Sequence, residues 1–131
     1  MNTSLSHLPE PEPYRVEPTI AARARSWLAD ASTEAVDCTQ LDPAIANVWT
    51  GELAQQWAAL IRPLGEPLDF YPFQMIADAN ATQYFFRVRY PSATMTWVFS
   101  LSPSGMVNGF GLRKSWNNRL ASIMLRDVTG Y

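Results

Sequence analysis

This chain of 131 residues contains only one cysteine and one histidine, the two residue types that most often bind zinc. Cys38 has no second thiol with which to form an internal disulfide, and a zinc site built from cysteines is excluded for the same reason. His7 lies in a polar segment interrupted by prolines, so a Ser-His-Asp or Cys-His catalytic group would require that segment to fold back into a site. We therefore expect no metal site, no cofactor and no histidine-based nucleophilic chemistry.

Long apolar runs are also lacking. No stretch approaches the roughly 20 apolar residues of a membrane span, and the first residues, MNTSLSHLPEPEPYRVEP, have neither the basic start nor the apolar run of a secretory signal. A cytoplasmic protein without membrane contact is therefore expected. Pro9, Pro11 and Pro13 alternate with glutamates in this segment, which favours an extended, flexible arm over residues 1–17.

Positive charge is scarce in the first part of the chain and abundant in the second. Residues 1–78 carry four arginines against eleven acidic residues, a net charge of −7, whereas residues 79–131 carry six basic residues against one acidic residue, a net charge of +5. Two interpretations are open: an acidic helical half that complements a basic sheet, or a basic surface that attracts an anionic ligand or partner. Nucleic acid is not expected as a partner, because the chain is acidic overall and no basic run is interleaved with stacking aromatics.

Apolar residues are plentiful, and their spacing changes once along the chain. Hydrophobic residues make up 47% and aromatic residues 12% of the sequence, enough for the core of one domain. Up to Leu64 they recur at helical spacing, which predicts helices from Pro18 and from Asp42, the expected N-cap. After Gly65, four runs rich in aromatic and β-branched residues predict strands over 67–78, 82–90, 93–101 and 106–114.

This order predicts an α+β fold, with N-terminal helices packed on one face of a curved antiparallel sheet of about four long strands. The domain is expected to span residues 18–113. The remaining residues, 114–131, are expected to form a tail that contains a short helix.

Turn residues suggest how the strands pair. A turn at Ser102–Gly105 pairs Leu101 with Val107, and an unbroken ladder from there places Gly109 and Gly111 beside the rings of Phe99 and Trp97. Because side chains alternate along a strand, one face then carries most of the large residues. This expected core face consists of Tyr71, Phe73, Met75, Tyr84, Phe86, Val88, Met95, Trp97, Phe99, Leu101 and Val107.

The opposite face is expected to be mixed. Phe85, Val98 and Phe110 would lie side by side across three strands, with Arg87 and Leu112 near them. An apolar patch ringed by polar residues is typical of a protein contact surface, and a two-fold homodimer is its commonest form. The alternative is an ordinary half-solvated sheet face with scattered apolar residues.

Three segments carry a resemblance to a known family: LAQQWAALIRPLGEPLDF (53–70), YFFRVRY (84–90) and MTWVFSLSPSGMVNGFGL (95–112). In this order they resemble the nuclear-transport-factor-2-like superfamily, a cystatin-like α+β cone. The likeness covers residues 19–113 and lies in the pattern of elements. It implies a pocket between sheet and helices and, in many members, dimerisation through the outer sheet face. The pocket residues that it suggests here are Trp27, Trp57, Tyr71, Tyr84 and Trp97.

The resemblance leaves three classes of function open. Catalytic members use carboxylates and a tyrosine inside the cone, so an isomerase or cyclase would use Asp69 with Tyr71 or Tyr84, unless Asp69 lies at the exposed mouth. The aromatic bulk of the expected core leaves less room for substrate, which favours a non-catalytic, dimeric domain that binds a small apolar ligand or a protein partner. A regulatory subunit that docks through Phe85, Val98 and Phe110 is the third class.

Overall fold

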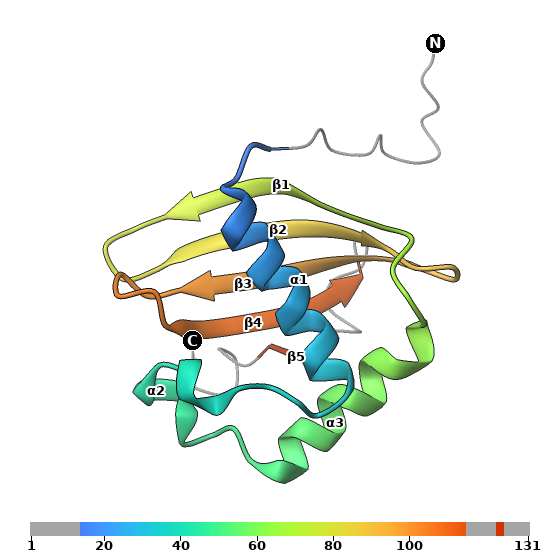
Figure 1. Cartoon of the computed structure of the whole chain (residues 1–131), viewed down its shortest axis with the longest axis horizontal. Coiled ribbons are helices and arrows are strands. Elements are labelled where there is room, and N and C mark those ends of the chain that lie inside the picture. Colours follow the sequence, from blue (N-terminus) through green and yellow to red (C-terminus); the bar gives the residue numbers. More distant parts are fainter. Residues whose placement is uncertain (1–13, 115–122, 125–131) are drawn as a thin grey trace.

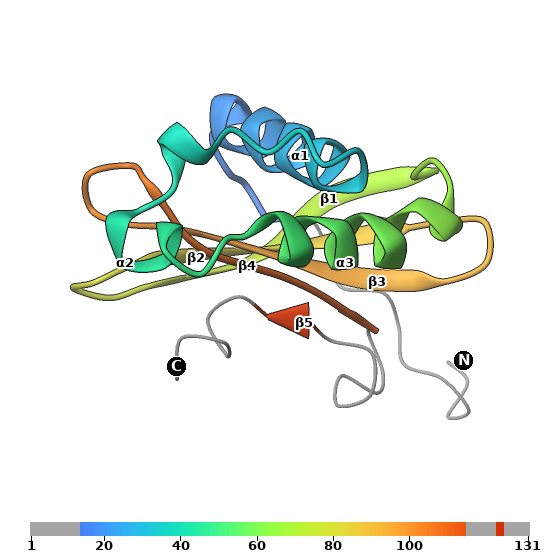
Figure 2. The same ribbon diagram turned by 90° about the horizontal axis from the view of Figure 1, so that it is seen from below.

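The computed structural model describes residues 14–114 and 123–124, which form a layer of helices on one face of an antiparallel sheet (Figures 1 and 2). The predicted α+β class is confirmed. The strands follow the order β1-β2-β3-β4-β5 across the sheet, so chain neighbours are also neighbours in space. The helices are α1 (Pro18–Ser32), α2 (Pro43–Ala46) and α3 (Gly51–Ile61), with short 3-10 turns η1 (Cys38–Gln40) and η2 (Arg62–Leu64). The strands are β1 (Asp69–Ala77), β2 (Thr82–Arg89), β3 (Thr94–Leu101), β4 (Val107–Lys114) and β5 (Ile123–Met124).

Local chemistry explains where the helices begin. Pro18 is the first residue of α1, where its missing N–H leaves no helical hydrogen bond unmade. The Asp42 side chain accepts a hydrogen bond from the Ala44 backbone N–H at 2.9 Å, so the predicted N-cap is confirmed. The hydroxyl of Thr50 caps α3 in the same way, accepting from the Leu53 N–H at 3.1 Å.

The register predicted for the two central strands is confirmed. Phe86 of β2 lies opposite Trp97 of β3, and Val88 lies opposite Met95. All four residues are buried against the helices. A regular antiparallel ladder keeps side-chain alternation in phase, which is why the pattern in the sequence predicts this part of the sheet correctly.

The predicted register of β4 is wrong beyond Val107. Leu101 pairs with Val107 as expected, but Ser100 pairs with Gly109, so Asn108 is an extra residue that bulges out of the ladder. Its side-chain oxygen accepts a hydrogen bond from the Ser100 hydroxyl at 2.6 Å, and its amide donates to the Asn80 backbone carbonyl at 3.4 Å. These contacts favour the bulge.

The consequence of this bulge is that every later side chain in β4 changes face. Phe110 and Leu112, predicted on the outer face, are fully buried in the core. The two glycines predicted beside core rings lie opposite outer-face residues instead: Gly111 pairs with Val98. The prediction that these glycines make room for the rings of Phe99 and Trp97 is therefore wrong.

A second bulge corrects the prediction for β1. Pro72 pairs with Phe86 and Gln74 with Phe85, so Phe73 is the extra residue. Proline has no N–H to offer the ladder, which makes an edge strand or a bulge its usual place in a sheet. Phe73 packs against Phe85 on the outer face rather than in the core. Tyr71, also predicted in the core, pairs with the outer-face residue Arg87.

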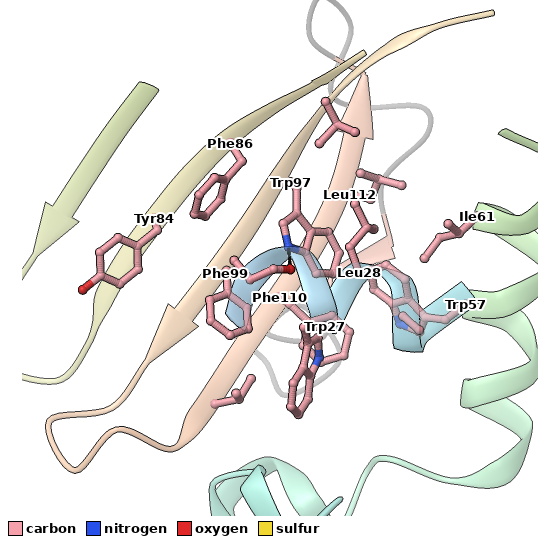
Figure 3. Close-up of a cluster of buried hydrophobic side chains, with 14 of the residues drawn as sticks. Trp27, Leu28, Trp57, Ile61, Tyr84, Phe86, Trp97, Phe99, Phe110 and Leu112 are labelled. Carbon is pink, nitrogen blue, oxygen red and sulfur yellow. Dashed lines mark hydrogen bonds between the residues drawn. The ribbon is translucent and has the colours of Figure 1, made fainter. Parts of the chain in front are cut away.

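Phe110 lies at the centre of the main core, among the tryptophans (Figure 3). The centroid of its ring lies 5.0 Å from that of Trp57, 5.7 Å from that of Trp97 and 5.8 Å from that of Trp27. The Trp97 indole N–H also donates a hydrogen bond to the Ala24 carbonyl of α1 at 3.0 Å. This bond joins the middle of the sheet to the helix that crosses it.

Parts of two predicted segments lie outside the described residues. Of the arm at 1–17, the structure describes Tyr14 onward, and the Tyr14 N–H donates to the Pro72 carbonyl of β1 at 2.8 Å. Of the tail with its predicted helix, it describes Lys114, which ends β4, and Ile123–Met124, which pair with β4 as strand β5. Among the described residues, no helix is long and apolar enough to cross a membrane.

Candidate functional site

A cavity of about 360 Å³ opens between the C-terminal half of α1, the end of α3 and the turn that joins β2 to β3. Figure 1 shows the end of α3 and this turn on the right-hand side of the molecule. Such a volume lies in the range of small-molecule sites. We call it the Tyr90 cavity; its lining residues are Arg25, Leu28, Ala29, Ser32, Thr33, Ile61, Arg62, Gly65, Glu66, Pro67 and Tyr90.

Tyr90 continues the core face of β2 by one further step. The side chains of Phe86, Val88 and Tyr90 alternate with outer-face residues, and all three are buried. Backbone hydrogen bonds between Tyr90 and Ala93, of 2.8 and 3.4 Å, hold the turn that follows. The position of Tyr90 is therefore set by the strand and the turn together. The sequence predicts Tyr90 as the last residue of the strand 82–90, and its alternation with Phe86 and Val88 was a signal that could have placed it on the core face.

The hydroxyl group of Tyr90 is one of several buried polar groups without a hydrogen-bond partner among the described residues; the indole nitrogens of Trp27 and Trp57 are others. Tyr90 is only 4% exposed, and in the described part of the chain its hydroxyl oxygen has no hydrogen-bond partner. Burial, together with the nearby charge of Glu66, raises the pKa of Tyr90 to about 12. The group is therefore an un-ionised phenol at neutral pH. Leaving such a group unpaired costs about 1–3 kcal/mol.

Arg62 ties the walls of the cavity together. Its Nε–H donates a hydrogen bond to the carbonyl of Ser32, the last residue of α1, at 3.0 Å. Its Nη2 atom lies 3.8 Å from a carboxylate oxygen of Glu34, and both of these side chains are exposed. An ion pair with this exposure adds little stability. The main role of Arg62 in the fold is thus to fix the end of α1 beside the end of α3.

The five residues suggested for a pocket do not line the Tyr90 cavity. Trp27, Trp57 and Trp97 pack around Phe110 in the core, with at most 3% of their surface exposed. Tyr84 is buried near the start of β2, where burial and the charge of Glu17 raise its pKa. The fifth residue, Tyr71 of β1, lies on the outer side of the sheet, where it pairs with Arg87.

The structure does not place the residues of the catalytic alternative together between the sheet and the helices. Asp69 begins β1 and is exposed, whereas Tyr84 pairs with Met75, six residues further along that strand. At the rise of a β-strand this separation is about 20 Å, far beyond hydrogen-bond reach. Asp69 pairs with Arg89 and Tyr71 pairs with Arg87, so these two residues both lie on the outer side of the sheet and not between the sheet and the helices.

The residues predicted for a dimer interface are divided between two places. Phe85 and Val98 form a small cluster with Phe73 on the outer sheet face, and they are only 8% and 1% exposed within the single chain. Arg87 covers this cluster, with its guanidinium carbon 4.8 Å from the centre of the Phe73 ring. Phe110 belongs to the main core, as does Leu112. Dimerisation through this face stays a prediction.

Replacing Tyr90 by phenylalanine tests whether its hydroxyl is unpaired. We expect Tyr90→Phe to leave the free energy of unfolding unchanged or to raise it by about 1 kcal/mol, because no hydrogen bond is lost and a buried polar group is removed. Urea denaturation measures this change. Thr50→Ala, which removes the cap of α3, serves as a control that should lose about 1 kcal/mol. A loss of that size in Tyr90→Phe would show that the hydroxyl has a partner.

Comparisons with protein-family models, with curated proteins and with solved structures found no match to this chain. They therefore add no family to the description above. The features that bear on a function are the cavity, the buried hydroxyl of Tyr90 and the charged residues of the cavity walls.

Proposed function

We propose that this chain is a non-catalytic binding domain that holds a small, largely apolar molecule in the Tyr90 cavity. Leu28 of α1, Ile61 of α3 and the ring of Tyr90 supply an apolar wall, while Arg25 and Arg62 supply polar groups. A concave, mainly apolar site with a few polar groups is the usual form of a small-molecule pocket.

One observation carries the proposal: a residue that lines the cavity has a buried hydroxyl without a hydrogen-bond partner in the described ranges 14–114 and 123–124. Natural proteins leave few such groups unpaired, and the exceptions need an explanation. A bound molecule that accepts a hydrogen bond supplies one. The hydroxyl oxygen is closed off from solvent, so a hydrogen bond to a bound molecule would require the Tyr90 side chain to move.

The nuclear-transport-factor-2-like resemblance is part of the same proposal. It is supported by the order of elements, two helical regions before an antiparallel meander, and by the placement of the helices on one face of the sheet (Figure 2). The site proposed here lies at one end of the helical layer, because aromatic side chains fill the space between the middle of the sheet and the helices.

Filling the cavity from its rim tests the proposal. Ala29 is exposed on α1 and lines the cavity, so a tryptophan at this position can fill the cavity without disturbing the core. The probe is N-phenyl-1-naphthylamine, a neutral apolar dye that fluoresces when it leaves water. We expect the dye to bind the wild type, and Ala29→Trp to weaken its binding by at least about tenfold, since a buried ligand needs most of its surface covered.

The matched control is Ala22→Trp. Ala22 is exposed on the same helix, two turns earlier, and does not line the cavity. This variant should bind the dye like the wild type, and circular dichroism should show both variants folded. Absence of dye binding by the wild type, or equal binding by both variants, would contradict the proposed function.

A further inference from the structure

Two arginines from separate elements border the apolar wall of the Tyr90 cavity. Arg25 comes from the middle of α1 and Arg62 from the end of α3, and both line the cavity. The guanidinium carbon of Arg25 lies 5.6 Å from the centre of the Phe70 ring. Stacking of this kind holds a guanidinium in place while its N–H groups remain available at the edges.

These two arginines differ in how much of their hydrogen-bonding capacity the fold uses. The Nε–H of Arg62 donates a hydrogen bond to the Ser32 carbonyl, and its Nη2 atom lies 3.8 Å from a carboxylate oxygen of Glu34. For Arg25, in the part of the chain that the structure describes, the only contact shown is the one with the Phe70 ring. A planar fork of N–H donors fits a carboxylate, which it binds with two parallel hydrogen bonds.

Given the proposed function, on which this step rests, we infer that the bound molecule is an apolar carboxylic acid, with its carboxylate at Arg25 and Arg62 and its apolar body against Leu28, Ile61 and the Tyr90 ring. The apolar wall and the guanidinium groups lie in one cavity. A neutral molecule would use the wall alone, whereas an anionic amphiphile uses both.

The other charged groups near the cavity are compatible with a bound carboxylate. Glu66 is the one acidic residue among those that line it, against the two arginines. Glu34 lies 3.8 Å from Arg62, and both of these side chains are exposed, so their ion pair is weak. The carbonyls at the C-terminal ends of α1 and α3 carry partial negative charge. At the end of α1, the hydrogen bond from Arg62 to the Ser32 carbonyl offsets part of this charge.

Tyr90 fits the same ligand. Its hydroxyl is un-ionised at neutral pH, so it has a proton to donate, and a carboxylate is a strong acceptor. Bonding to a carboxylate would satisfy the buried hydroxyl that otherwise has no partner in the described part of the chain.

A matched pair of competitors tests the inference in the full chain at neutral pH. Decanoate and 1-decanol have the same chain length and differ in charge, and each is titrated against bound N-phenyl-1-naphthylamine. We expect decanoate to displace the dye from the wild type at a concentration about tenfold lower than 1-decanol does, the advantage of a charge-assisted hydrogen bond. Arg25→Gln should remove most of this advantage and leave displacement by 1-decanol unchanged.

Arg15→Gln is the control for net charge, because Arg15 is exposed and lies outside the cavity. It should keep the wild-type preference for decanoate. Equal displacement by both competitors, or an equal loss of preference in both variants, overturns the carboxylic acid and leaves the proposed function standing as long as Ala29→Trp still weakens dye binding. If Ala29→Trp binds the dye as tightly as the wild type does, the proposed function is overturned, and this inference with it.

Discussion

Replacing Phe110 by aspartate is expected to unfold the protein. The ring of Phe110 is fully buried, and its centroid lies between 5.0 and 5.8 Å from those of four tryptophans. A carboxylate at this position would have neither water nor a cation beside it, and the cost of such burial exceeds about 5 kcal/mol. Because a small domain has a total stability of about 5–15 kcal/mol, most molecules should lose their fold. Far-UV circular dichroism and urea denaturation measure the result.

Ile76→Asp is the matched control, since Ile76 lies in edge strand β1 and is 45% exposed. It should change the free energy of unfolding by no more than about 1 kcal/mol. A folded, cooperatively unfolding Phe110→Asp variant would contradict the structure, because it would mean that Asn108 does not bulge and that Phe110 faces outward, as the sequence pattern predicts.

Trp57→Ala is expected to lower the free energy of unfolding by about 3–5 kcal/mol. Trp57 has no exposed surface, and its ring packs edge-on against Trp97 and at 5.0 Å from Phe110. Alanine would leave a cavity that helix α3 and the sheet, each held by its own hydrogen bonds, cannot fully close. Urea denaturation with an unchanged m-value would report the loss.

Trp49→Ala is the control for Trp57→Ala. Trp49 contacts the same Phe110 ring, at 5.5 Å, but is only partly buried and precedes α3. It should cost about 1–2 kcal/mol, since less apolar surface is lost from the interior and water can fill the space. If the two variants lost equal stability, the central position that the structure gives to Trp57 would be wrong.

The helices and the two central strands could be predicted from the sequence because their signals are local. Pro18 and Asp42 mark helix starts through chemistry that acts within one turn. In β2 and β3 no residue is inserted, so the alternation that places Phe86 and Trp97 in the core holds from end to end.

The strands that carry bulges could not be predicted in the same way. An extra residue at Asn108 reverses the face of Phe110, and one at Phe73 leaves Tyr71 outside the core. The contacts of the Asn108 side chain that favour the β4 bulge reach Asn80, 28 positions away in the chain. The alternation of side chains within a strand does not depend on a partner so distant in the chain, so it cannot predict the bulge. An error of one residue then places every later side chain of the strand on the wrong face.

The sequence by itself determined the α+β class, the starts of the helices and the core face of β2 and β3, because periodicity and capping act over a few residues. Only the tertiary structure decided where Phe110 lies and that Arg25, Arg62 and Tyr90 share one cavity. These three residues come from a helix, the end of another helix and a strand end. They meet because burial of the tryptophan core packs α1 and α3 side by side on one face of the sheet.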